Sequence, residues 1–177
     1  MLHQGLLLPL TFILGSISWR FILGVLYFPK VKEKELDIYE ILKPLVAIHL
    51  FRYMSMSLLI PGLTTAYSIL PKMHIYRLAA GDIGASLLAM LTLTALYRRW
   101  HKAHIFVIIF SIWGLADLGM ATLFDMPLLV QNVNKLDTRL FGVLTTFIPL
   151  VFVSHVFIVK TLWTHRKDFP RKRKIEL

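Results

Sequence analysis

The chain has 177 residues, of which 56% are hydrophobic and 17% are charged, and its mean hydropathy is +0.66. Soluble domains are about 25% charged, so this composition excludes an ordinary soluble protein and indicates an integral membrane protein. The net charge of +10 does not indicate a nucleic-acid partner, because the basic residues cluster at the ends of apolar segments. The chain has no cysteine, which excludes thiolate ligands, and we expect no metal site.

Apolar segments of membrane-spanning length fill most of the chain. A bilayer core about 30 Å thick requires roughly 20 apolar residues per helix. Five segments meet this requirement, and we predict spans at 5–28, 42–61, 77–97, 104–124 and 141–163. The sequence therefore predicts an all-α integral membrane protein, with a five-helix transmembrane domain over residues 1–163 and a basic cytoplasmic tail over residues 164–177.

Lys and Arg residues near the span ends predict the orientation of the chain. With the N-terminus outside, 14 of the 20 Lys and Arg residues lie near the cytoplasmic ends of the spans and four lie near the outer ends. Only Arg20 and Arg52 lie within spans. We therefore expect the N-terminus outside and the C-terminus in the cytoplasm.

Ionisable residues inside the predicted spans are the strongest functional signal in the sequence. His49 and Arg52 lie three residues apart in "AIHLFRYMSMSLLIPG", and therefore on one helical face. The third span contributes Asp82, the fourth Asp117 and the fifth His155. A charged residue at a helix centre costs about 2.5–3.5 kcal/mol on insertion scales, so such residues usually face a partner or a water-filled cavity.

The depths of these residues predict two polar layers. Counting about 1.5 Å per residue places Arg52, Asp82 and Asp117 in the outer half of the bilayer, with His49 and His155 just below them. A guanidinium between two carboxylates would balance one of their two negative charges. We expect these five residues to form a ligand-binding pocket that binds or passes a small molecule or protons.

Two alternatives remain open. His49 and His155, at matching depth on different helices, could bind haem b axially in a membrane redox protein. The charges could instead hold three helices together in a structural or assembly subunit, because glycines that permit close helix approach flank both aspartates: Gly81, Gly84, Gly114 and Gly119. Paired aspartates can also act as acid and base, so the sequence leaves open whether the protein is an enzyme.

Four short motifs carry a resemblance to a known group of proteins: "HLFRY", "AAGD", "WGLAD" and "SHVFI". In these motifs the chain resembles an uncharacterised family of small bacterial membrane proteins with several spans. The resemblance covers the second to fifth spans and implies a location in the bacterial cytoplasmic membrane. It implies no activity and assigns no site residues.

Overall fold

The computed structural model describes residues 2–29 and 37–165, and this part of the chain is helical, with no β-strand. Four helices are long and apolar enough to cross a membrane: Leu6–Val25, Lys72–Tyr97, Ala103–Gln131 and Thr138–Thr164. The predicted all-α membrane class is confirmed at this level. The predicted tail and the cations Lys30, Lys32 and Lys34 lie outside the described residues, apart from the first two residues of the tail.

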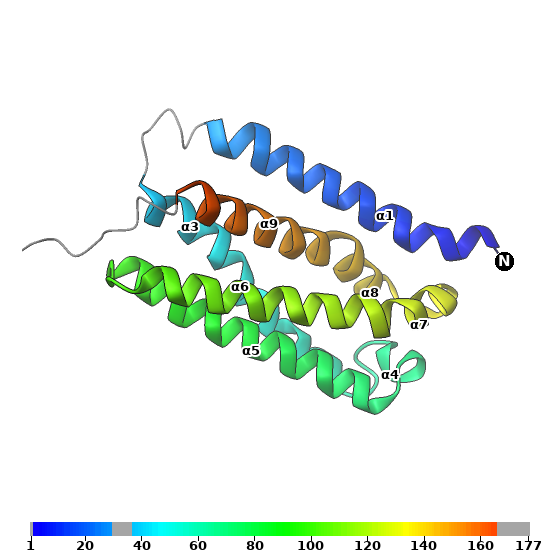
Figure 1. Ribbon diagram of the computed structural model, residues 1–177. Coiled ribbons are helices and arrows are strands. Elements are labelled where there is room, and N and C mark those ends of the chain that lie inside the picture. The colour runs from blue at the N-terminus through cyan, green and yellow to red at the C-terminus, as the bar shows by residue number, and fades with distance from the viewer. Residues whose placement is uncertain (1, 30–36, 166–177) are drawn as a thin grey trace, which may run out of the picture.

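The helices form an antiparallel bundle in which the chain repeatedly crosses the molecule (Figure 1). α1 (Leu2–Phe21) lies along one side of the bundle, next to α9 (Ile148–Thr164). α5 (Lys72–Tyr97) and α6 (Ala103–Met120) pack against each other on the opposite side. Many large apolar side chains remain exposed, and Leu123, for example, is 70% exposed. Such exposure is expected of surfaces that face lipid.

The predicted second span is helical but has two different geometries. Asp37 begins α3 (Ile38–Ala47) by accepting a hydrogen bond from the backbone N–H of Glu40, at 3.1 Å. The 3-10 helix η2 (Ile48–Leu59) continues α3 and packs mainly on α5. At about 1.5 Å per α-helical residue and about 2.0 Å per 3-10 residue, the two parts have a combined length of roughly 39 Å.

Prolines explain the wide turns in the long helices. The π-helical segments of the described chain are η1 (Ile22–Tyr27), η3 (Ala121–Asp125) and η5 (Val143–Phe147). They end two residues before Pro29, Pro127 and Pro149, respectively. A proline ring clashes with the carbonyl group four residues earlier, and in each case that carbonyl lies within the π segment. The wider turn therefore lets each helix accommodate its proline.

Short elements close the end of the bundle at which α5 begins. They are α4 (Ala66–Ile69), α7 (Met126–Gln131), η4 (Val133–Lys135) and α8 (Thr138–Gly142). Asp137 caps α8 by accepting from Leu140 N at 2.7 Å, and its second oxygen accepts from Thr65 N at 2.8 Å. The Thr65 hydroxyl accepts in return from Asp137 N at 3.1 Å, so two segments far apart in the sequence are joined.

Two apolar clusters fill the interior at opposite ends of the bundle. One contains Leu42, Leu96 and Phe110, and the other contains Leu8, Ile75 and Leu140. The polar residues in the centre of α5 and α6 lie between these clusters along their helices.

Candidate functional site

Arg52 and His49 enter the interior from the same row of η2. Residues i and i+3 eclipse each other in a 3-10 helix, so the two side chains leave the helix one above the other. His49 is fully buried and Arg52 is 2% exposed. The 3-10 geometry thus brings a cation and an imidazole together into the bundle.

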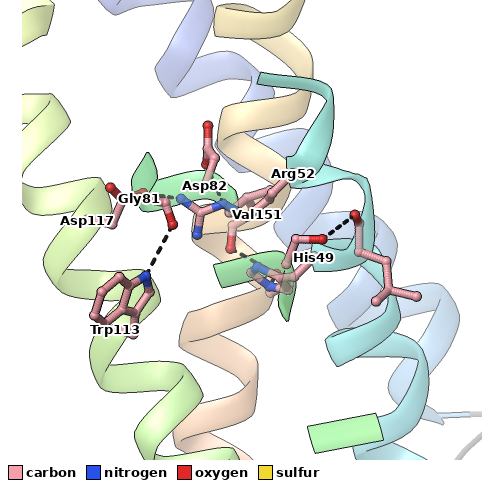
Figure 2. A network of polar contacts seen from close by, with 10 residues as sticks. His49, Arg52, Gly81, Asp82, Trp113, Asp117 and Val151 are labelled. Atoms are coloured by element: carbon pink, nitrogen blue, oxygen red, sulfur yellow. Dashed lines mark hydrogen bonds and ion pairs between the residues drawn. The ribbon is translucent and has the colours of Figure 1, made fainter. Parts of the chain in front are cut away.

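Arg52 contacts two carboxylates that come from two other helices (Figure 2). Its Nε donates to Asp82 Oδ1 on α5 at 2.6 Å, and its Nη2 donates to Asp117 Oδ2 on α6. The aspartate side chains are 16% and 14% exposed, respectively. Charge-assisted bonds of this kind are roughly twice as strong as neutral ones. One guanidinium therefore connects η2, α5 and α6.

Glycines on α5 make the approach of α6 possible. A Cβ at Gly81 would overlap the carboxylate of Asp117, and a Cβ at Gly84 would lie 2.8 Å from the indole of Trp113. Trp113 Nε1 donates to the carbonyl oxygen of Gly81 at 3.1 Å, as Figure 2 shows. The small residues in the sequence thus set the distance at which Asp117 reaches Arg52.

The histidines form a second layer beside this ion pair. His49 Nε2 lies 2.7 Å from Ser154 Oγ, and the Ser154 hydroxyl lies 2.8 Å from the carbonyl oxygen of Val151. A hydroxyl has one hydrogen, and Ser154 donates it to Val151, so His49 Nε2 carries a proton and donates to Ser154. The two contacts together therefore require a hydrogen on Nε2 of His49.

His49 and His155 contact each other directly. Their ring centroids are 4.2 Å apart, and Phe110 packs against both rings at 4.8 and 5.0 Å. Rings in such contact leave no room for a porphyrin between them, so the structure does not support the haem alternative. Both ring nitrogens of His155 and Nδ1 of His49 are buried, with no hydrogen-bond partner among the described residues.

Comparison with protein families identifies one matching family model. A family model described as a domain of unknown function, DUF8737, matches residues 7–163. The chain belongs to this family. No curated protein and no solved structure matches the chain. The matched region contains all five predicted site residues, and the family description names no activity.

A second buried ion-pair cluster lies nearer the end of the bundle at which α5 begins. Asp125 is 1% exposed, and its carboxylate accepts from His74 Nδ1 at 2.6 Å and from Arg77 Nη2. We predicted that the fourth span ends at residue 124, which places Asp125 in a loop. The structure shows no loop at this point, because η3 and α7 continue the helix to Gln131 and place Asp125 within it. The sequence signal for the cluster is the pair His74 and Arg77, three residues apart on one face of α5.

The structure brings together all five side chains that the sequence selected, in the two predicted groups: three in the ion pair and two in the imidazole pair. Within the described part of the chain, no three His, Asp or Glu side chains are arranged to hold a metal ion. The arrangement offers proton donors and acceptors in the bundle interior, supplied by four different helices.

Proposed function

We propose that this member of the DUF8737 family crosses the membrane five times. We further propose that its charged layer, formed by Arg52, Asp82 and Asp117, takes up and releases protons within the bilayer. The N-terminus would face outward and the C-terminus would face the cytoplasm, as the Lys and Arg residues indicate. The length of the segment at residues 38–59, roughly 39 Å, supports its assignment as a span in addition to the four long apolar helices. The motif resemblance makes a bacterial cytoplasmic membrane the expected location.

The main support for the proposal is the net charge of the Arg52 group, by which we mean Arg52 with its partners Asp82 and Asp117. One guanidinium contacts two carboxylates, so the group has a net charge of −1 when both carboxylates are ionised. Burial makes an unbalanced charge costly, and the binding of one proton by a carboxylate would remove it. Intramembrane Asp and His residues form proton relays in pumps and transporters, which supports this role over that of a passive charge.

The close packing of the layer favours protons over a larger ligand. Asp117 fills the space beside Gly81, and Trp113 fills the space beside Gly84. A small molecule bound between Arg52 and its carboxylates would have to separate these contacts, whereas a proton needs no such space. The pocket predicted for a small molecule is therefore best interpreted as a site for protons.

Polar groups on both sides of the layer offer the proton further positions. His49 lies on the same η2 row as Arg52 and contacts His155, and these rings have buried nitrogens available to a proton. On the other side lie Asp125 and its partners His74 and Arg77. A relay through these groups would run from the outer end of α5 toward the centre of the bundle.

Proton flux into vesicles tests the proposal. The full chain is reconstituted in liposomes that contain a pH-sensitive dye, and a potassium diffusion potential set with valinomycin drives proton entry. We expect faster acidification than in empty liposomes, and the loss of that excess in Asp82→Asn and Asp117→Asn. Asp37→Asn is the matched control, because Asn retains the helix cap outside the spans while the same charge is removed. Equal rates in wild-type, variant and empty liposomes would contradict the proposal.

The packing of the ion pair also favours a second candidate function, in which the charges hold η2, α5 and α6 together in a structural or assembly subunit. The overlap that a Cβ at Gly81 would create shows that the helices are fitted closely around Asp117. This candidate predicts no flux in wild-type liposomes and a large loss of stability in single-charge variants.

A further inference from the structure

A groove lies between the first helix and α9, away from the charged layer. Its volume is about 640 Å³, and it is open to the surface of the molecule. Its apolar lining includes Ile17, Phe21 and Val25 from the first helix and Phe157 from α9. Phe28 stacks on Phe157 with ring centroids 4.7 Å apart, which forms an aromatic wall at one end. Both helices are candidate spans, so the groove faces lipid.

Two cations line this mainly apolar groove, whose lining also includes the polar residues Thr161, Thr164 and His165. Arg20 comes from α1 and Lys160 comes from α9, and both side chains are exposed. Neither forms an ion pair with any residue that the structure describes, and no carboxylate of residues 2–29 or 37–165 lines the groove. Arg20 lies five residues before the end of its span at Val25, and Lys160 lies four residues before the end of α9. Both α-carbons are therefore roughly 6–8 Å from the ends of the candidate spans, within reach of lipid headgroups.

We propose that this groove is a binding site for one anionic phospholipid from the leaflet at the C-terminal end of α9. The lipid phosphate would bind between the Arg20 guanidinium and the Lys160 ammonium, while an acyl chain would lie along Ile17, Phe21 and Val25. Snorkelling alone explains one isolated cation, but it does not explain two cations on different helices that share one apolar groove. An anionic phospholipid such as phosphatidylglycerol combines a net negative charge with long apolar chains, and both match this lining.

Native mass spectrometry of the full chain, released from vesicles of equimolar phosphatidylglycerol and phosphatidylcholine, tests the site. We expect one phosphatidylglycerol to remain bound per chain in preference to phosphatidylcholine. Each groove cation should contribute on the order of fivefold to this preference, so Arg20→Gln together with Lys160→Gln should nearly abolish it.

Two single variants separate the groove from the general charge of the protein. Lys102→Gln removes one cation between α5 and α6, at the same end of the bundle but outside the groove, and should retain the preference. Gly24→Leu keeps both cations but places a large side chain beside Phe157, and should lose the bound lipid.

Several results would overturn the proposal. They are equal retention of the two lipids, an unchanged preference in the double variant, an equal loss in Lys102→Gln, or no bound lipid in the wild type. The last result is also the one expected if another segment of the chain fills the groove. The lipid site does not depend on proton transfer, so either proposal can fail without the other.

Discussion

Gly114 of α6 lies directly against the imidazole ring of His155 on α9, and a Cβ at residue 114 would overlap Nε2 of that ring. The absence of a side chain at Gly114 therefore permits the contact between His155 and His49. Gly119, on the same helix, has no atom within 4 Å of the position its Cβ would take. The two glycines of α6 thus have different packing roles.

Gly114→Ala should destabilise the protein by about 1–3 kcal/mol, because the added methyl group forces the His155 ring or the α9 backbone to move. Gly119→Ala should be neutral or should stabilise by up to about 1 kcal/mol, because alanine favours the helix and meets open space. Thermal unfolding of the purified protein in detergent measures both effects. Equal stability of the two variants would show that residue 114 is not closely packed.

Removing Arg52 alone should destabilise the protein more than neutralising Arg52, Asp82 and Asp117 together. Arg52→Gln leaves Asp82 and Asp117 buried without their cation, and breaking such a buried pair typically costs about 3–5 kcal/mol. Combining Arg52→Gln with Asp82→Asn and Asp117→Asn removes the uncompensated charge, so this triple variant should be more stable than the single variant. Unfolding free energies of the two variants provide the comparison. Additive losses would mean that the three groups do not interact as the contacts indicate.

Ser154 should stabilise the folded protein through its hydrogen bond with His49. Ser154→Ala leaves the buried Nε2–H of His49 without its acceptor, which should cost about 1–3 kcal/mol. Ser18→Ala is the control, because the exposed Ser18 hydroxyl bonds only to a carbonyl of its own helix, that of Leu14. Chemical unfolding of both variants tests the difference, and a neutral Ser154→Ala would contradict the hydrogen placed on Nε2 of His49.

We expect the ionised Asp137 carboxylate to stabilise the folded protein and this stabilisation to be lost in acid. Its hydrogen bond from the Leu140 backbone, and secondarily the one from Thr65, hold the pKa of this carboxyl below its ordinary value of 3.8. The lowered pKa means that the stabilisation is complete above pH 3.8 and is lost as the pH falls through the folded-state pKa. Asp137→Ala should cost about 1 kcal/mol at neutral pH through loss of the helix cap.

The pH profile separates this effect from a loss of packing. The difference in unfolding free energy between wild-type protein and Asp137→Ala should shrink as the pH is lowered below 3.8. A difference that stays constant with pH would contradict the assigned role of the carboxylate.

The sequence predicts the Arg52 group because few stable arrangements exist for a charge in lipid. Arg52, Asp82 and Asp117 lie in separate apolar segments at similar depth, so pairing is the arrangement with the lowest cost. Local spacing also predicts that His49 lies beside Arg52, whether the helix is α or 3-10. These inferences need only helical periodicity and depth.

Other features depend on local geometry that residue spacing does not specify. The π segment before Pro127 continues the fourth helix, so Asp125 becomes buried instead of lying in a loop. The groove between the first helix and α9 depends on how two helices pack, and Arg20 alone indicates only snorkelling. Burial of individual side chains is therefore where the sequence prediction fails.

Infrared difference spectroscopy tests the central claim most directly, because it detects whether the carboxylates that contact Arg52 bind a proton. Spectra of the reconstituted protein are compared between the acidic and alkaline limits within which it stays folded. We predict a protonated-carboxyl band in the acidic state that is lost at alkaline pH, and that is reduced in Asp82→Asn and Asp117→Asn but retained in Asp37→Asn. Identical spectra for all four proteins would mean that the two aspartates remain ionised as a fixed ion pair, which would contradict the account.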